Sequence, residues 1–340
     1  MLAVERVRHM SAAALPFRRL LLAVLIVSIW GSNFVALKLA LHDLPPLLLV
    51  TLRFIFVSIP AVFFLKRPAV PLRQLLVYGF SMFAFQFSFM FLGMKLGVSA
   101  GLASLILQFQ VFVTLGLAVV FLKETVSFPQ IAGALLATVG FVVVGMHTGG
   151  EMTIAGFICL LLAAISWAIG NFTSKRLGKV NPLALVVWGS LPVSFAMAAA
   201  SLVFEGPTLI VHSLTHVSLT AILCTAYTVY FSTLVAYSLW SWLLARHPAT
   251  TITPFALLVP VFGMITSAIF LGEPLPGWKL VAAALVIAGL SLTIFGASLL
   301  KFFRPATETL PPTVNQDNPG ELRAKTEAAT LKLAGEIKVR

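Results

Sequence analysis

The sequence predicts an all-α integral membrane protein in which ten transmembrane helices form two inverted five-helix repeats. Three observations lead to this prediction: the composition, the lengths of the apolar segments and an internal repeat. Of the 340 residues, 59% are hydrophobic and only 10% are charged, and the mean hydropathy is +1.02. Soluble domains carry about 25% charged residues. The composition therefore excludes a water-soluble protein and makes the lipid bilayer the solvent of this chain.

Apolar segments of spanning length recur along the whole chain. A helix needs about 20 mostly apolar residues to cross a bilayer. Ten segments meet this need, at residues 20–38, 46–65, 74–94, 99–122, 127–146, 152–174, 183–204, 217–244, 249–271 and 277–300. Short loops with turn residues separate them, among them the connection at Pro207, and Pro254 and Pro260 predict a kink in the ninth segment.

The basic residues set the orientation. With a cytoplasmic N-terminus, 19 of the 23 Lys and Arg residues fall on the cytoplasmic side, as the positive-inside rule requires. Both tails, residues 1–19 and 301–340, are then cytoplasmic. The net charge of +12 is explained by topology, and we expect no nucleic-acid partner.

The chain repeats itself. Glu124 and Glu273, like Gly140 and Gly289, are 149 residues apart, and Asn33-Phe34 recurs 138 residues later as Asn171-Phe172. The repeats span residues 20–146 and 152–300. Because five is odd, the second copy enters the membrane from the other side, which places Glu124 at the cytoplasmic face and Glu273 outside. Inverted repeats are typical of secondary transporters, which work by alternating access.

These residues resemble a known family. Trp30-Gly31-Ser32-Asn33-Phe34, Arg53-Phe54, and the glutamates that close the fourth and ninth helices are similar to the EamA-type branch of the drug/metabolite transporter superfamily, over about residues 18–300. The resemblance implies a central cavity between helices 1, 3, 4, 6, 8 and 9. Further stretches are similar to bacterial exporters of O-acetylserine and cysteine: Leu41-His42, Pro45-Pro46, Ala100–Leu105, Gln108-x-Gln110 and Leu257–Val261. The resemblance thus implies export of small amino-acid-like metabolites across the bacterial inner membrane.

Arg53 is the strongest single candidate for substrate binding. It lies seven residues into the second predicted helix, roughly 10 Å below the outer surface, where an arginine costs several kcal/mol unless it meets water or a partner. The sequence offers no carboxylate at that depth. Two interpretations stand: Arg53 binds a substrate carboxylate, or it snorkels or caps a neighbouring helix.

Other polar residues fall on helix faces that suit a cavity. Gln108 shares a face with Ser104, and Gln86 lies on the third helix. Asn33 and Asn171 are repeat equivalents near opposite membrane edges. For all of these the alternative is hydrogen bonding between helices.

The eighth helix carries a predicted tyrosine face of Tyr227, Tyr230 and Tyr237. Its length of about 15 Å exceeds an interfacial aromatic belt, so it suits a cavity wall. Trp30 is a weaker candidate that plain packing also explains. Lys38 is another, for which snorkelling is the alternative.

Several function classes were weighed against export of amino-acid-like metabolites. The tyrosines favour, as an alternative, an exporter of aromatic or cationic compounds. An enzyme would need a nucleophile, metal ligands or paired carboxylates within the bilayer, and a scaffold would need no wet cavity. The sequence predicts a small-molecule substrate and a monomer or weak homodimer. It predicts no cofactor, no metal site and no buried carboxylate for proton coupling.

Overall fold

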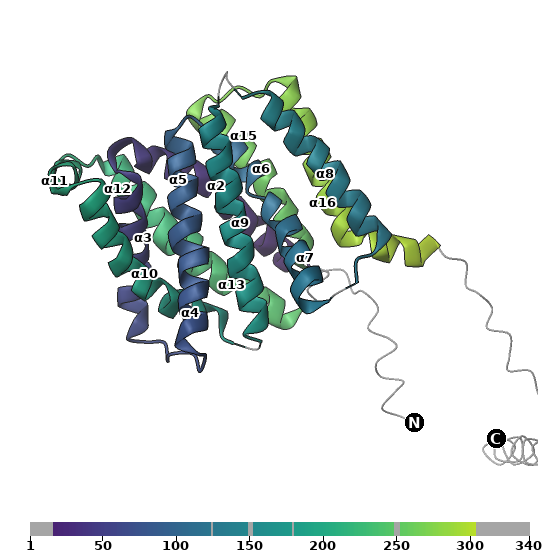
Figure 1. Ribbon diagram of the computed structural model, residues 1–340, viewed down its shortest axis with the longest axis horizontal. Coiled ribbons are helices and arrows are strands. Elements are labelled where there is room, and N and C mark those ends of the chain that lie inside the picture. The colour runs from purple at the N-terminus through teal and green to yellow at the C-terminus, as the bar shows by residue number, and fades with distance from the viewer. Residues whose placement is uncertain (1–15, 124, 149–151, 179, 248–251, 304–340) are drawn as a thin grey trace, which may run out of the picture. The chain divides into compact units, whose positions relative to one another are not determined.

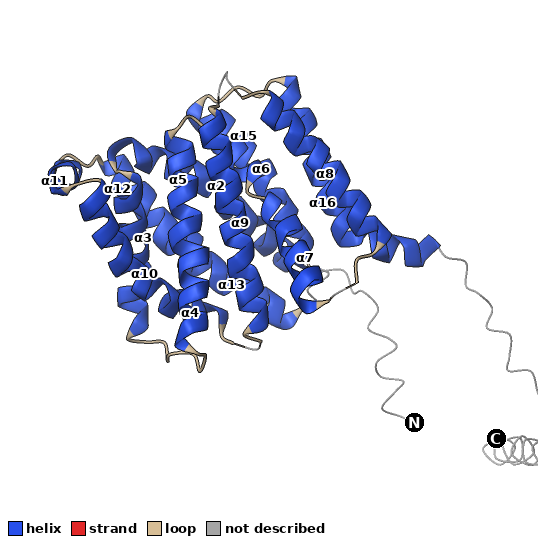
Figure 2. Cartoon of the chain, viewed as in Figure 1, coloured by secondary structure: helices blue, strands red, loops and turns tan. Residues whose placement is uncertain are grey.

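The computed structural model describes residues 16–123, 125–148, 152–178, 180–247 and 252–303 (Figure 1). Residues 1–297 form one compact unit and residues 298–340 a second; the first is described below. Every regular element among the described residues is a helix (Figure 2). Glu124 and both tails, except residues 16–19 and 301–303, lie outside the described residues.

Within the described part of the chain, eight helical segments are long and apolar enough to cross a membrane. They are α2 (Phe17–Asp43), α4 (Leu72–Gly79) with η1 (Phe80–Phe85) and α5 (Gln86–Lys95), α6 (Ala100–Ile106) with α7 (Phe109–Leu122), α8 (Phe128–Met146), α9 (Ile154–Arg176), α10 (Pro182–Phe204), α12 (Leu219–Ala226) with η2 (Tyr227–Val235) and α13 (Ala236–Arg246), and α16 (Gly277–Phe303). Two further apolar segments are shorter, α3 (Pro46–Val62) and η3 (Thr253–Leu258) with α15 (Val259–Leu271).

The connection at Pro207 is more than the loop that the sequence predicts. It contains a helix, α11 (Pro207–Thr215), after Gly206 ends α10 with a φ of 80°. Glycine adopts this conformation without a steric penalty, and proline suits a first helical turn. Gly206 therefore ends α10, and Pro207 directly begins α11.

Four of the ten apolar segments are not regular α-helices along their whole length. The third and eighth segments contain the π-helices η1 and η2. The fourth is broken at Leu107 and Gln108 between α6 and α7, and the ninth begins as the 3-10 helix η3 around Pro254. The proline signal predicted the irregular ninth helix. The π-helices have no comparable marker, and a π turn often marks a functional position in a helix.

Helices pack closely where glycine removes a side chain. α3 packs on α10, α5 and α7 pack on α9, and α15 packs on α2 and α6. A Cβ atom on Gly31 would meet Phe262 Cβ at 2.4 Å, and one on Gly133 would meet the Gly289 carbonyl oxygen at 2.5 Å. The second contact joins α8 to α16, which run side by side in Figure 1. Small residues thus set the helix spacing, as is usual in membranes.

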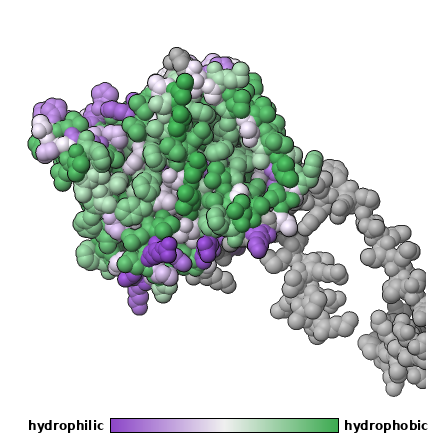
Figure 3. Space-filling view, viewed as in Figure 1, coloured by the Kyte–Doolittle hydropathy of each residue, from purple (hydrophilic) through white to green (hydrophobic). Residues whose placement is uncertain are grey.

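The distribution of hydrophobic and hydrophilic residues over the surface is the one expected of a protein that spans a bilayer. Hydrophobic residues cover the side of the bundle seen in Figure 3, and hydrophilic residues gather toward its two ends. Large hydrophobic side chains that are exposed in the bundle include Phe195, Ile269 and Leu135. We call the end that carries α11 and the last turns of α2 and α5 the α11 end.

Candidate substrate site

Arg53 is buried in the bundle with most of its guanidinium unsatisfied. Only 4% of the residue is exposed. Nη2 donates to Thr233 Oγ1 at 3.1 Å, whereas Nε and Nη1 are buried and have no hydrogen-bond partner. The guanidinium carbon lies 4.2 Å from the centre of the Phe87 ring. Because a buried charge is costly unless it is paired and hydrogen-bonded, this geometry calls for an anion beside Arg53.

Aromatic groups from α2 and α13 lie close to this arginine. Tyr237 interacts electrostatically with Arg53, and its ring lies 5.3 Å from the ring of Trp30. Trp30 Nε1 donates to the Ser232 carbonyl at 3.0 Å, within the π-helix η2. Trp30 therefore joins α2 to η2 at Ser232, the residue before the Thr233 that accepts a hydrogen bond from Arg53.

The tyrosines do not form the single face that the sequence predicts. Tyr227 lies against α2, with its hydroxyl 2.7 Å from Ser32 Oγ, and Tyr237 packs on Trp30. Tyr230, by contrast, is 44% exposed. The prediction of one face was wrong because it assumed α-helical spacing, whereas η2 completes each turn with extra residues.

Both repeat-equivalent asparagines hydrogen-bond to a neighbouring helix. Asn33 Oδ1 accepts from Thr228 Oγ1 at 2.8 Å, which joins α2 to η2. Asn171 Nδ2 donates to Gln110 Oε1 at 2.8 Å, which joins α9 to α7. These are the contacts expected for polar side chains between membrane helices.

The remaining candidates from the third and fourth helices are buried but separate. Gln86 and Gln108 are 5% and 8% exposed, and no hydrogen bond of either side-chain amide is found among the described residues. Ser104 is fully buried and donates to the Gly101 carbonyl. It fills the contact with α15, where a Cβ on Gly263 would meet its Oγ at 2.4 Å.

Two lysines bind the ends of neighbouring helices. Lys38 Nζ on α2 donates to the Met94 carbonyl at 2.7 Å and the Val98 carbonyl at 3.3 Å. Lys95 Nζ on α5 donates in return to the Leu41 carbonyl at 3.1 Å. The last carbonyls of a helix lack intrahelical donors and carry partial negative charge. Lys38 thus lies at the α11 end and joins α2 to α5.

Two glutamates with equally specific contacts were not among the predicted site residues. Glu205 accepts from the backbone N–H groups of Leu47 and Leu48 at 2.7 and 2.9 Å, at the start of α3. Glu273 accepts from those of Ala100 and Gly101 at 2.7 and 3.1 Å, at the start of α6. For Glu205 the sequence signal is a lone carboxylate after an apolar segment, whereas Glu273 is marked by the internal repeat. The partners of both glutamates lie far away in the chain.

A bundle of apolar helices around a buried arginine defines a polytopic membrane protein. Among the described residues there is no group of three or more His, Cys, Asp or Glu side chains that would hold a metal ion. The chain belongs to the EamA-like transporter family, whose profile matches it twice, at residues 18–146 and 154–295.

Curated relatives cover most of the chain. It is 41% identical over 281 residues to a "probable amino-acid metabolite efflux pump" of Salmonella typhimurium, which covers 81% of this chain and 94% of that protein. A protein of the same description from Escherichia coli K12 is 39% identical, with the same coverage. A solved crystal structure matches with a TM-score of 0.58 at 18% identity, over 84% of this chain and 99% of that one. The last likeness supports the fold alone.

Proposed function

We propose that this protein exports small amino-acid-like metabolites of the cysteine and O-acetylserine type by alternating access, with Arg53 binding the substrate carboxylate. The observation that carries the proposal is the buried guanidinium with two unpaired nitrogens. A carboxylate accepts paired hydrogen bonds from such a planar group better than any other common metabolite anion except phosphate. The two relatives described as amino-acid metabolite efflux pumps support the same class of substrate.

We further propose ten membrane crossings in two inverted repeats, with both termini cytoplasmic and the α11 end facing outward. The double family match supports two copies. The irregular segments support it as well, because π-helices occur in the third and eighth segments and breaks occur in the fourth and ninth. Lys123 and Gly272, 149 residues apart, both end their helices with a positive φ, of 53° and 65°. Equivalent distortions at equivalent positions are expected of structural repeats.

The burial of the fourth segment supports a state closed at the α11 end. All residues of α6, which begins at that end, are buried. Most residues of α7, which continues toward the other end, are half-buried. In alternating access one end of the binding site is sealed while the other admits substrate. The greater burial of α6 than of α7 is what we expect of a state that is closed at the α11 end and looser at the opposite end.

The alternative, export of aromatic or cationic compounds, has weaker support. Aromatic rings do lie near the site, among them Phe87, Trp30 and Tyr237. However, Arg53 itself occupies the face of Phe87, and its charge repels a second cation. A zwitterion avoids this repulsion, because its carboxylate pairs with Arg53 while its ammonium faces tyrosine oxygens or ring faces.

The test is flux of labelled cysteine and O-acetylserine in proteoliposomes. Arg53→Ala should lower uptake at least about tenfold, the loss expected when a charge-assisted hydrogen bond is removed. Arg53→Met keeps the volume and should fail equally, and its melting temperature should not fall because an unpaired buried charge has been removed. The matched control is Arg73→Ala, at an exposed arginine near the start of α4. Full flux in both Arg53 variants would refute the proposal, and competition by aromatic cations alone would favour the alternative.

A further inference from the structure

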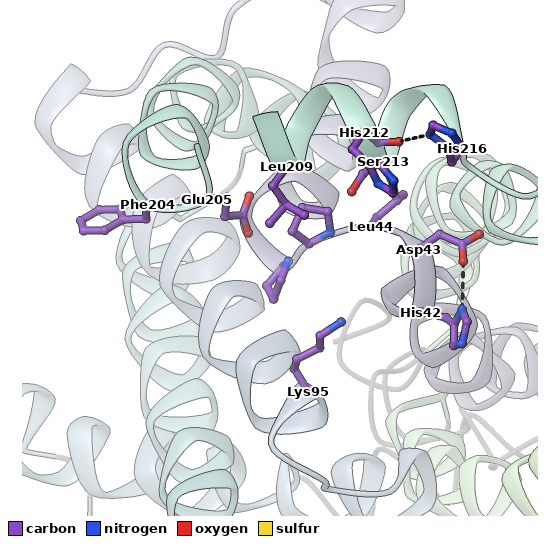
Figure 4. A pocket seen from close by; sticks show the side chains of 12 residues that line it. His42, Asp43, Leu44, Lys95, Phe204, Glu205, Leu209, His212, Ser213 and His216 are labelled. Atoms are coloured by element: carbon purple, nitrogen blue, oxygen red, sulfur yellow. Dashed lines mark hydrogen bonds and ion pairs between the residues drawn. The ribbon is translucent and has the colours of Figure 1, made fainter. Parts of the chain in front are cut away.

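A second concave site lies at the α11 end, separate from Arg53. We call it the α11 pocket. Its volume is about 510 Å³, within the range of about 300–1,000 Å³ usual for small-molecule sites. The α2–α3 connection, the end of α5, the end of α10 and one face of α11 line it. Figure 4 shows its charged and titratable side chains, which are His42, Asp43, Lys95, Glu205, His212 and His216.

Both carboxylates of the α11 pocket are already engaged. Asp43 accepts from the Ser218 backbone N–H at 2.9 Å and from His42 Nδ1 at 3.0 Å. Glu205 accepts from two backbone N–H groups of α3 and, at 2.6 Å, from Ser201 Oγ. Every carboxylate oxygen thus has a donor. These groups keep the pocket walls in place and leave little capacity to bind a cation.

The groups with unused capacity are donors. Lys95 is exposed, and its ammonium carries three N–H groups, of which one is directed at the Leu41 carbonyl. Its Nζ points into the middle of the pocket (Figure 4). His212 and His216 stack at 4.4 Å on the α11 side. His216 Nδ1 donates to the His212 carbonyl at 3.0 Å, so the Nε2 of its neutral ring is an acceptor, and the ring N–H group that remains for a ligand is that of His212. The pocket therefore suits an anion.

Its position suggests which anion. Pro46 lines the pocket and begins α3, and Arg53 lies seven residues further along the same helix, an axial distance of roughly 10 Å. The α11 pocket thus lies about two turns of α3 from Arg53, on the side proposed to face outward.

We propose that the α11 pocket binds the carboxylate of a small amino-acid-like molecule, with Lys95 as the cation and His212 as a further donor, and that it is the site from which the exported molecule is released. The second half of this statement rests on the proposed function. The first half does not, because the donor set and the volume stand without it.

The experiment measures ligand protection of a cysteine placed in the pocket. Leu209 lines the pocket and is 47% exposed, so Leu209→Cys, with Cys159 and Cys224 replaced by serine, gives one reactive thiol. The purified full-length protein in detergent is treated with a polar maleimide while O-acetylserine is titrated. We expect saturating ligand to slow labelling at least about threefold, and the methyl ester of O-acetylserine, which lacks the carboxylate, to give no protection.

Variants assign the effect to its residues. Lys95→Gln should raise the half-protecting concentration about tenfold, as loss of one charge-assisted hydrogen bond predicts. A His212→Gln/His216→Gln double variant provides a second test should Lys95→Gln fold poorly, and it should raise that concentration several-fold. The matched control is His147→Gln, since His147 stacks on Trp278 outside the pocket, and protection should be unchanged.

Arg53→Ala separates the two sites. It should abolish flux in liposomes and leave protection at position 209 intact. A half-protecting concentration that is unchanged in Lys95→Gln, protection that disappears in Arg53→Ala, or equal protection by the methyl ester would overturn the assignment. Equal protection by sulfate would show an unselective anion site and overturn it too. Protection without any flux would support the α11 pocket and reject the proposed function. Flux without protection would support the proposed function and reject the α11 pocket.

Discussion

Replacing Glu273 by glutamine should open the α11 end. Glu273 follows α15 and receives two backbone N–H groups at the start of α6. Glutamine keeps the shape but loses the charge, and it turns an N–H₂ group toward one of the two donors. A charge-assisted hydrogen bond contributes about 1.5–3 kcal/mol. Because Glu273 is half-buried, we take about 2 kcal/mol as the loss, which corresponds to a shift of roughly 30-fold in an equilibrium between closed and open states.

The assay follows access to the contact between α6 and α15. Met264 is 6% exposed and faces Gly101 in that contact, so Met264→Cys in a background without native cysteines reports opening. A water-soluble maleimide should label it 10–30-fold faster in the Glu273→Gln variant. Glu205→Gln is the matched control, because Glu205 caps α3 instead of α6. Equal labelling rates, within twofold and in folded protein, would show that the Glu273 contact does not hold this end closed.

Two further substitutions test the packing and the site. Gly31→Ala places a methyl group 2.4 Å from Phe262 Cβ and 2.9 Å from the Gly263 nitrogen, so it should destabilise the protein by about 1–3 kcal/mol and lower its melting temperature by several degrees; an unchanged melting temperature would contradict the tight α2–α15 contact. Thr233→Val removes the one hydrogen-bond partner found for Arg53 and should raise the half-saturating substrate concentration by several-fold while flux persists. An unaltered concentration would mean that Thr233 does not orient the guanidinium.

The sequence predicts the positions of the helices well, because each apolar segment carries its own length and turn signals. It also draws attention to Arg53, because an arginine within an apolar helix is unusual, and the structure buries this residue; its role in substrate binding stays a prediction. The π-helices η1 and η2 were missed because no residue type demands them. Their hydrogen bonds depend on tertiary contacts such as that of Trp30 with the Ser232 carbonyl. The prediction of a single tyrosine face was wrong for the same reason. A helical wheel assumes about 3.6 residues per turn, and the π-helix η2 has more.

The capping glutamates illustrate a second limit. Glu205 and the first residues of α3 are more than 150 positions apart in the chain, so no local pattern joins them. The repeat did reveal Glu273, but only as a marker at a helix end. That its carboxylate binds the start of α6 became evident only when the helices were placed in space.

The distribution of charge connects these features. The described carboxylates at the α11 end are bound to backbone N–H groups: Asp43 to Ser218, Glu205 to α3 and Glu273 to α6. The lysines there bind helix carbonyls, so these charges stabilise helix ends. Arg53 alone among the buried arginines and lysines that the structure describes has guanidinium or ammonium nitrogens recorded as unsatisfied. Under the proposed function, the substrate carboxylate would supply the anion that Arg53 lacks. Its binding would favour the conformation in which Arg53 is paired, and this preference would couple binding to export.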